Sequence, residues 1–598
     1  MGVFALLLLF SLQAQGRIYV ITNTNDTTKI SSLRGAIMDA NSHGGNNTIM
    51  LGQSRRRLTY RLTLSGADED AARTGDLDIT NGSLTINGVG ADVTIDATGL
   101  GDRVFQVFPR ASLKLKNLII TGGTAPGNGD AWFEDGESGG AIYNAGALSL
   151  ENCIITNNSS GGGNFPEGNA GGTGGGDGGG IYNSGTLTMN NCIVAGNLSG
   201  TGADGAPGGN GGGIKNDGTC LLTDCVICEN HSGNGGGPDG NSEGFGGSGG
   251  NGGGVYNAGT IVFNNCIVSD NISGQGSSGS GPSGIVTIYF PGGWGGSGGD
   301  GSGIYNAGQM RLNFSTVNGN SCGNGGDGGS FGTGGNAGAG GGGAGIFNAG
   351  QSSLNTCTIS GNICGNGGAG GSGDLGGGAS GASGGGGGGI CNAGSLDLTS
   401  CTIALNQTGA GGNGGNTVSS FFNSSSAVSS GGQGGDGGGV LNDTSTTNVI
   451  LRNTLIALNT TSAGGLGGTN GNYYGQQATI GDAGSEGFGP DLAGDFTSQG
   501  FNLIGMADGS IGFVNGVNAD QVGSIASPID PFIGPLQMNG GPTPTHALLP
   551  GSPAVDQGNS FGIHTDQRGY YRPYDYPSIP NAPGGDGSDI GAFELGAH

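Results

Sequence analysis

The sequence has little charge of either sign, and most of the charge that it has is negative. Only 10% of its 598 residues are charged, with 17 Lys and Arg against 43 Asp and Glu, which gives a net charge of −26 at pH 7. So few basic residues offer little attraction to nucleic acid phosphates or to an anionic membrane surface. We therefore expect no nucleic acid partner.

Two long-range patterns are also missing. Glycine supplies 147 residues, but no strict Gly-x-y period runs through them, which excludes a collagen triple helix. After the N-terminus, no stretch approaches the roughly 20 apolar residues of a membrane-spanning helix, so we expect none. Residues 1–15 hold an apolar run, Val3 to Leu12, and resemble a secretory signal peptide, although no Lys or Arg precedes the run. This segment predicts export.

What the chain has instead is one unit repeated between residues 139 and 460. The unit reads Gly-Gly-Gly-Ile-Tyr-Asn-x-Gly-x-Leu-x-x-x-Asn-Cys-x-Ile-x-x-Asn, and its eight copies begin at residues 139, 178, 211, 252, 301, 343, 387 and 437. Alternation within the second copy puts five side chains on one face: Ile181, Leu187, Met189, Cys192 and Val194. A unit of about 20 residues cannot bury such a face alone, so copies must stack. We predict an all-β fold, a parallel β-helix with one copy per rung.

Glycine-rich insertions separate the rungs, and all of them follow the last Asn of the unit. We therefore expect them to emerge along one edge of the solenoid. Their composition predicts flexible coil, with packed extended glycine helices as the alternative. Near the N-terminus, Ser31 or Ser32 begins a predicted capping helix, whose apolar face would consist of Leu33, Ala36, Ile37 and Ala40.

Identical residues at identical positions of the units should stack into ladders. A buried turn Asn can hydrogen-bond to its copies above and below, which satisfies an amide that is costly to bury alone. The predicted Asn ladder consists of Asn144, Asn183, Asn216, Asn257, Asn306, Asn348, Asn392 and Asn442. The predicted Cys ladder, completed by Ser315 and Thr454, consists of Cys153, Cys192, Cys225, Cys266, Cys357 and Cys401. A third ladder consists of Tyr143, Tyr182, Lys215, Tyr256, Tyr305, Phe347, Cys391 and Leu441. We interpret all three as rung packing rather than as arrays of ligands.

Cysteines and glycine-following aspartates are the candidates for cross-links and metal sites. Cys322 and Cys364 lie at equivalent turn positions of successive rungs and are a possible disulfide. Cys225 and Cys228 have a metal-ligand spacing, but a strand would point them to different faces. Four aspartates follow glycine runs as in calcium-binding β-rolls, without the nine-residue period: Asp177, Asp300, Asp327 and Asp436. We predict no metal and no cofactor, with calcium as the alternative.

The repeat body also lacks the residues that polysaccharide cleavage requires. Its cations are Lys215, Arg311 and Arg452, on different rungs, and its one histidine is His231. A lyase needs a cation beside a base, and a hydrolase needs neighbouring carboxylates. We therefore predict no catalytic residues there, and an enzyme would have to use the non-repeat ends. In the C-terminal end, we interpret Asp566, Arg568 and Arg572 as buried ion pairing that closes the last rung.

The repeats resemble those of right-handed parallel β-helix proteins of bacterial surfaces, including relatives of the polymorphic outer-membrane proteins. Residues 31–37 (SSLRGAI) resemble the CSLREA domain, with Ser31 at the position of its cysteine and Gly35 at that of its glutamate. The C-terminal segment is similar to the choice-of-anchor Q domain at residues 500–505, 530–531, 534–537, 539–546, 550–556, 566–569, 572–573 and 589–594. The resemblance implies a β-helix at the bacterial surface and no known reaction. Because the chain ends four residues after Glu594, we expect no sorting signal.

These observations define five regions and one leading function. The regions are a signal peptide (1–15), an N-terminal cap with irregular rungs (16–138), the eight-repeat β-helix (139–460), last rungs and linker (461–499) and the anchor-Q-like domain (500–598). We expect a secreted or cell-surface, monomeric, non-enzymatic protein, adhesin-like or structural, with surface glycans or envelope components as partners. The alternatives are a carbohydrate-active enzyme that uses the ends, and a glycan-binding module that uses insertion aromatics: Phe165, Phe245, Tyr289, Phe290, Trp294, Phe331, Phe421 and Phe422.

Overall fold

The structure is a computed structural model of the full chain. It describes residues 16–597 apart from 53–56, 67–68, 91, 128–133, 166–170, 239–243, 282–290, 375–376, 418–427, 444–447 and 471–477. The apolar segment 1–15 and the insertion aromatics Tyr289, Phe290, Phe421 and Phe422 lie outside the described residues.

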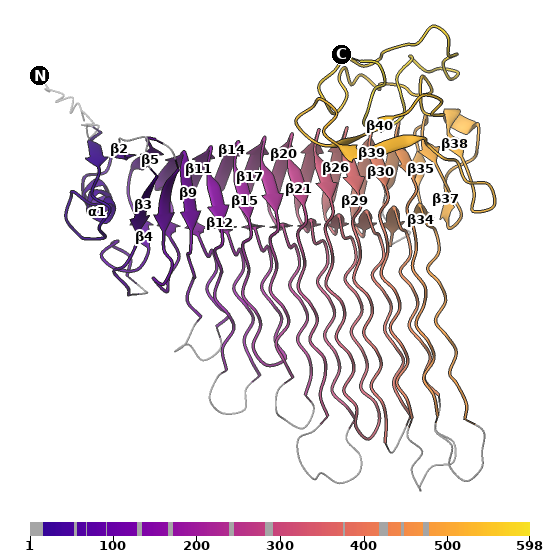
Figure 1. Ribbon diagram of the computed structural model, residues 1–598, viewed down its shortest axis with the longest axis horizontal. Helices are drawn as coiled ribbons and strands as arrows, with labels where there is room; N and C mark the ends of the chain where they lie inside the picture. The colour runs from indigo at the N-terminus through magenta and orange to yellow at the C-terminus, as the bar shows by residue number, and fades with distance from the viewer. Residues whose placement is uncertain are drawn as a thin grey trace, which may run out of the picture.

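The described chain is a parallel β-helix whose rungs build three long sheets (Figure 1). Sheet 1 is formed, in spatial order, by β1 (Ile18–Ile21), β2 (Asn46–Leu51), β5 (Ser83–Gly88), β8 (Ser112–Lys116), β11 (Ala147–Glu151), β14 (Thr186–Asn190), β17 (Thr219–Thr223), β20 (Thr260–Asn264), β23 (Gln309–Asn313), β26 (Gln351–Asn355), β29 (Ser395–Thr399), β32 (Val449–Arg452) and β35 (Thr497–Ser498).

Sheet 2 is formed by β3 (Leu58–Arg61), β6 (Val93–Asp96), β9 (Leu118–Thr121), β12 (Ile154–Thr156), β15 (Ile193–Ala195), β18 (Val226–Cys228), β21 (Ile267–Ser269), β24 (Thr316–Asn318), β27 (Thr358–Ser360), β30 (Thr402–Ala404), β33 (Leu455–Ala457), β36 (Leu503–Ile504) and β38 (Gln521–Val522). Sheet 3 is formed by β4 (Leu77–Ile79), β7 (Phe105–Val107), β10 (Ile142–Asn144), β13 (Ile181–Asn183), β16 (Ile214–Asn216), β19 (Val255–Asn257), β22 (Ile304–Asn306), β25 (Ile346–Asn348), β28 (Ile390–Asn392), β31 (Val440–Asn442), β34 (Leu492–Asp495) and β37 (Ser510–Ile511).

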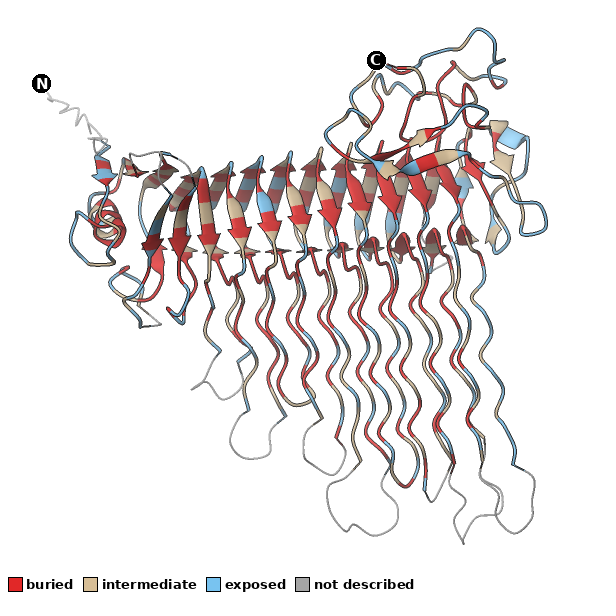
Figure 2. Cartoon of the chain, viewed as in Figure 1, coloured by how far each residue is buried: buried red, intermediate tan, exposed pale blue. Residues whose placement is uncertain are grey.

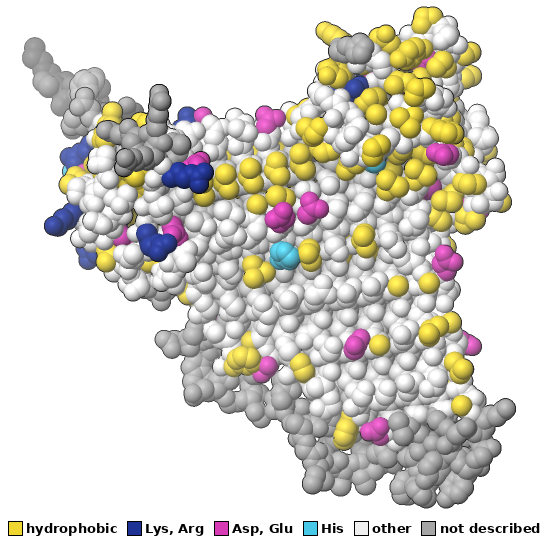
Figure 3. All heavy atoms as spheres, in the orientation of Figure 1, with side chains coloured by type: hydrophobic (Ala, Val, Ile, Leu, Met, Phe, Trp, Pro, Cys, Tyr) yellow, Lys and Arg dark blue, Asp and Glu magenta, His cyan; other side chains and the backbone are white. Residues whose placement is uncertain are grey.

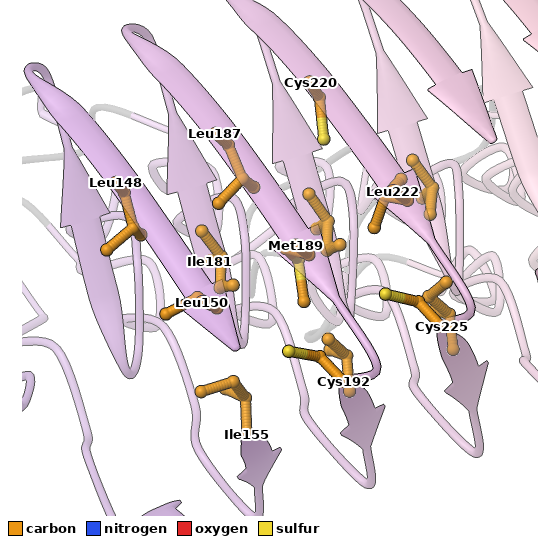
Figure 4. Close-up of a cluster of buried hydrophobic side chains, with 14 of the residues drawn as sticks. Leu148, Leu150, Ile155, Ile181, Leu187, Met189, Cys192, Cys220, Leu222 and Cys225 are labelled. Carbon is orange, nitrogen blue, oxygen red and sulfur yellow. The ribbon is translucent and has the colours of Figure 1, made fainter. Parts of the chain in front are cut away.

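The core fills the space between the three sheets. The side chains expected to face inward in the second repeat are each at most 1% exposed: Ile181, Leu187, Met189, Cys192 and Val194. Register places the four strand residues among them on their counterparts in the next rung, so the core is one continuous column (Figures 2 and 4). Stacking thus supplies the burial that a lone rung cannot reach, and the predicted fold class is confirmed.

A helix closes the N-terminal end. Helix α1 (Leu33–His43) starts after Ser32, whose hydroxyl accepts a hydrogen bond from the Gly35 N–H at 3.2 Å. The predicted apolar face is buried, and α1 lies against β2 and β4. Within the described residues, no helix is long and apolar enough to cross a membrane.

The C-terminal part, residues 530–597, folds back over the outer face of sheet 2 (Figure 1). It contains an antiparallel pair, β39 (Ile533–Gln537) and β40 (Thr545–Leu548), and a short 3₁₀ helix, Val517–Ala519, precedes it. Leu455 and Leu503 of sheet 2 join Leu548, Ile590 and Phe593 in one buried apolar cluster. The fold therefore ends in a block of irregular chain that stands on the last rungs.

The insertions hang from one edge of the solenoid, between sheet 2 and sheet 3, as neighbouring extended segments (Figure 1). We call their described residues, from 159 to 488, the glycine slab. In residues 198–210 exposure recurs at every third position, the period of a polyproline II-type helix. Each rung contributes an outgoing and a returning segment, and backbone bonds join the two layers, as in Gly233 N–H to the Gly209 carbonyl at 2.9 Å.

Hydrogen bonds also run along the slab from rung to rung. The Gly202 N–H donates to the Asn234 carbonyl at 3.0 Å, and the Gly235 N–H donates to the Gln275 carbonyl at 2.9 Å. The prediction that the insertions leave at one edge is confirmed. The prediction of flexible coil is wrong for the described residues, because segments without side chains approach closely enough to satisfy one another's backbone groups.

Candidate functional site

A polar groove of about 440 Å³ lies where the irregular N-terminal rungs meet the segment just before the first repeat. It is lined by Glu69, Asp70, Asp76, Asp102, Arg103, Gln106, Gly136, Glu137, Ser138, Tyr143 and Tyr182. The lining thus combines five carboxylates and one guanidinium beside two phenol rings. We call it the acidic groove.

Sheet 3 positions the groove's side chains. Register aligns Asp78 of β4, Gln106 of β7, Tyr143 of β10 and Tyr182 of β13 in one outward-facing row. Asp76 comes directly before β4, and the Asp102–Arg103 pair lies just before β7. One wall of the groove is therefore the start of the third predicted ladder, before the repeat becomes regular.

Arg103 is held from several sides. Its guanidinium pairs with Glu137, lies 3.6 Å from Asp76, and donates to Gln106 Oε1 at 2.8 Å. It also sits 5.7 Å from the centre of the Tyr143 ring. Burial disfavours its charge, but Asp76, Glu137 and Asp102 outweigh burial and raise the pKa of Arg103. Arg103 is therefore already neutralised and is a poor partner for an anionic ligand.

Asp76 and Asp78 form a buried acid pair behind Arg103. Asp76 is 4% exposed and Asp78 1% exposed, so both carboxyl groups are removed from solvent. Burial, followed by the charge of Asp78, raises the pKa of Asp76 well above its ordinary value. Burial also raises the pKa of Asp78 to about 7. Asp102 caps the arrangement by accepting the Asp76 N–H at 3.1 Å.

These features limit what the groove can bind. The excess of carboxyl groups and the stacked Tyr143 and Tyr182 rings, 5.0 Å apart, suit a neutral or amine-bearing polyhydroxyl ligand. A polyuronate would face five carboxylates against one paired cation. Among the described residues, no group of three or more His, Cys, Asp or Glu could hold a metal ion.

The predicted Asn ladder lies on the inner side of sheet 3. Each Nδ2 donates to Oδ1 of the next Asn at 2.6–3.0 Å, from Asn144 to Asn442. Asn442 then donates to the Asp495 carbonyl at 2.8 Å. All members are at most 5% exposed, so they satisfy one another and present nothing to a ligand.

The predicted Cys ladder is buried too, and all of its thiols are free. Each thiol donates to the carbonyl two residues before it, as Cys225 does to Thr223 at 3.2 Å. Ser315 and Thr454 make the same bond with their hydroxyls, at 2.8 and 2.9 Å. The ladder therefore holds the turn before sheet 2 rather than a metal.

Cys322 and Cys364 lie on successive rungs and are both free thiols in the structure. Each donates to a slab carbonyl at 3.3 Å, Cys322 to Gly342 and Cys364 to Gly386. Serines occupy this position in earlier rungs, as in Ser232, which donates to the Gly250 carbonyl at 2.6 Å. The structure therefore places the two cysteines in a chain of side chains that join the slab's two layers, and the disulfide between them stays a prediction.

A second Asn ladder escaped the sequence reasoning. The final Asn of the units stacks between the core and the slab, with Nδ2–Oδ1 distances of 2.8–3.0 Å: Asn158, Asn197, Asn230, Asn271, Asn320, Asn362, Asn406 and Asn459. It ends on the Asp491 carboxylate at 2.9 Å. The sequence could have predicted this ladder, because the same Asn ends every copy of the unit just before its insertion begins.

The remaining candidate metal ligands, the glycine-following aspartates and the Cys225–Cys228 pair, have structural positions. Each glycine-following Asp accepts a backbone N–H of the next rung: Asp177 from Asn210, Asp300 from Gly342, Asp327 from Ala369 and Asp436 from Phe488, at 2.6–2.9 Å. Cys228 faces outward and Cys225 inward.

The basic residues of the repeat body lie on different rungs. Lys215 pairs with Asp217 at 2.8 Å, Arg452 pairs with Asp397 at 3.0 Å, and Arg311 is exposed on β23. In the C-terminal part, buried Arg572 pairs with Glu594 and Arg568 with Asp566, both at 2.7 Å.

The insertion aromatics within the described residues are partly exposed. Phe165 is 66% exposed, and Phe245 and Trp294, on neighbouring rungs, are 42% and 55% exposed with ring centres 5.8 Å apart. Phe331 is half-buried. The structure thus leaves one aromatic pair on the slab available for contact.

The fold and the ladders define a parallel β-helix with a packed glycine slab. Comparison with family models, with curated proteins and with solved structures found no match. The CSLREA and choice-of-anchor Q resemblances therefore stay predictions.

Proposed function

We propose that this is an exported, non-enzymatic protein of the bacterial cell surface, adhesin-like or structural. One observation carries the proposal: the polar side chains of the repeat body bond to the next rung. On the slab surface, Asn234 Oδ1 accepts the Gln275 N–H, and Gln275 Oε1 accepts the Asn324 N–H, at 2.9 and 2.8 Å. Side chains used in this way stiffen a plate and leave few groups for chemistry.

The acidic groove supports a second candidate, binding or processing of a glycan at the N-terminal rungs. Acid catalysis on carbohydrates needs a carboxyl group that holds a proton near neutral pH, and burial raises the pKa of Asp78 to about 7 beside Asp76, which lines the groove. The groove's charge favours neutral or amino polysaccharides over uronates.

Product analysis on a polysaccharide panel separates the two candidates. Purified protein is incubated with neutral, amino and acidic polysaccharides, with and without calcium, and reducing ends and unsaturated products are measured. No product from folded protein, with binding to cells or to a glycan array, supports the adhesin-like function. New reducing ends would overturn the non-enzymatic proposal and point to the acidic groove.

A matched pair of tyrosines tests glycan binding at the groove. Tyr143 lies on the groove's rim, whereas Tyr305 occupies the same ladder position between Tyr256 and Phe347, at 4.8 and 5.0 Å. We expect Tyr143→Ala to weaken binding of a neutral oligosaccharide about fivefold, through loss of a stacking surface of about 1 kcal/mol. Tyr305→Ala should leave it unchanged in calorimetric titration. Equal losses in the two variants would show that the groove is not the site.

A further inference from the structure

Five neighbouring strands of sheet 2 each carry one outward aliphatic side chain. Register aligns them in one row, which we call the aliphatic stripe: Ile119, Ile154, Ile193, Val226 and Ile267. Ile193 is 38% exposed and the others are partly exposed. Figure 3 shows a band of hydrophobic side chains that runs along the solenoid to the C-terminal part. Such a row contributes nothing to the core, which lies on the other side of the sheet.

The chemistry of this row changes at both ends of the stripe. The two strands before it carry Thr59 and Thr94 in the same register. The strands after it carry Thr316, Thr358 and Thr402, whose hydroxyls bond to the C-terminal part at 2.6–3.0 Å. Aliphatic residues thus occupy five of the rungs that the described chain leaves open. A row of this kind beside polar neighbours marks a contact surface.

The same face already binds apolar chain further along. Beyond the threonines the row continues as Leu455 and Leu503, which are fully buried against Ile590 and Phe593 of the C-terminal part. That interface covers five rungs, from Thr316 to Leu503. The stripe is the next five rungs of the same row, and it spans about 20 Å at the spacing of β-strands.

The shape of the molecule decides how a second copy could cover the stripe. The C-terminal part rises above sheet 2 as a step beside the stripe (Figure 1), so two stripes cannot meet face to face. We propose that two copies associate antiparallel about a twofold axis between β21 and β24, with the C-terminal part of each on the stripe of the other. The C-terminal part and the aliphatic stripe each span five rungs, so the twofold axis generates the same contact twice in the dimer.

The C-terminal part offers an apolar surface for this contact. Hydrophobic side chains gather over it on the face that also shows the stripe (Figure 3). Its exposed side chains include Phe532, Met538, Leu549 and Tyr571, which are 51%, 58%, 42% and 77% exposed. The net charge of −26 on each copy opposes association, so added salt should strengthen the dimer. This departs from the monomer expected from the sequence.

Sedimentation velocity over a range of concentrations tests the proposal. We expect the parent protein to dimerise, more tightly at high salt, and Ile193→Glu to be monomeric because it places a charge in the centre of the stripe. Thr188→Glu is the matched control, since Thr188 is exposed on β14 of the neighbouring sheet. Both positions face solvent, and circular dichroism should show unchanged folding.

Each result decides the matter. A parent that stays monomeric at every concentration and salt overturns the proposal, and so does a dimer that Ile193→Glu leaves intact or that Thr188→Glu also disrupts. Oxidation of an Ile193→Cys variant tests the geometry. In the proposed arrangement the two Cys residues lie far apart, so a 193–193 disulfide in the dimer would overturn it, and its absence from a stripe-dependent dimer supports it.

Discussion

At the scale of the residue, the same amino acid serves different purposes within one rung. Asn183 ends β13 with its amide fully buried, donating to Asn216 Oδ1 at 2.6 Å and accepting from Asn144. Asn190 ends β14 seven residues later, with an exposed side chain. Asn183 recurs in every copy of the unit, whereas Glu151 and Thr223 stand at the position of Asn190 in the neighbouring rungs, so recurrence separates the ladder member from the surface residue.

We expect Asn183→Ala to lower the free energy of unfolding by about 1–3 kcal/mol, because its neighbours' buried amides lose their partners. Asn190→Ala should change it by less than about 0.5 kcal/mol, as is usual for a surface position. Denaturant unfolding followed by circular dichroism measures both. Equal effects would contradict a structural role for the ladder.

The Asp76–Asp78 pair makes stability depend on pH. Burial raises the pKa of Asp78 from 3.8 to about 7, so between these values the folded protein holds a proton that the unfolded chain releases. Stability therefore falls as pH rises through this window. We expect Asp78→Asn, which keeps an oxygen for the Ala72 N–H, to flatten that part of the profile of melting temperature against pH.

The exposed turn residue Asp270 provides the control for this experiment. Asp270→Asn removes a carboxylate of the same kind and should leave the profile as steep as in the parent. A parent profile that rises between pH 4 and 7 relative to Asp78→Asn would refute the assigned direction of the shift.

At the scale of the element, the rungs could be predicted and the slab could not. The alternation in Ile181, Leu187 and Met189 reports side-chain burial, so it identifies the inner face of each strand. Glycine carries no side chain, and its packing depends on partners 30 to 50 residues away, such as Asn234 for Gly202. The acidic groove was missed for a similar reason, since Asp76, Arg103 and Glu137 come together only across irregular rungs.

A pair of glycines in one insertion tests the packing of the slab. A Cβ on Gly233 would run into the Gly200 carbonyl oxygen, whereas a Cβ on Gly237 would meet nothing within 4 Å. We expect Gly233→Ala to cost about 1–3 kcal/mol and to open the insertion to proteases. Gly237→Ala should be cleaved no faster than the parent in limited proteolysis. Rapid cleavage of the parent itself at these residues would show that the slab is not packed.

The sequence marks the last segment of the slab. In the returning layer, glycines such as Gly384 and Gly434 donate N–H to the carbonyl of the next rung, at Gln433 and Ser485. The residue that follows Ser485, where each earlier rung has glycine, is Glu486, and it is exposed. A side chain is tolerated there because no further segment follows. A charge at this open edge also disfavours the addition of another chain.

At the scale of the whole molecule, two quasi-one-dimensional stacks run side by side: the β-helix with its core and the slab without one. The second Asn ladder, from Asn158 to Asn459, lies where they join, and its amides donate to sheet 2 carbonyls, as Asn230 does to Val194 at 2.9 Å. A stack of this kind is stabilised by contacts between neighbouring rungs. Its rigidity therefore depends on the slab being unbroken, which suits a protein that presents a surface rather than one that closes on a substrate.

Deleting one insertion at a time tests that dependence. Replacing residues 231–251 by a short turn removes an interior segment with two neighbours, whereas replacing residues 461–488 removes the last segment, which has one. In a nearest-neighbour stack the interior deletion should therefore lower stability about twice as much as the terminal one. Thermal unfolding measures the difference, and small-angle scattering should show a looser envelope only for the interior deletion. Equal losses would mean that the insertions fold independently of one another, and that the solenoid alone sets the stiffness of the molecule.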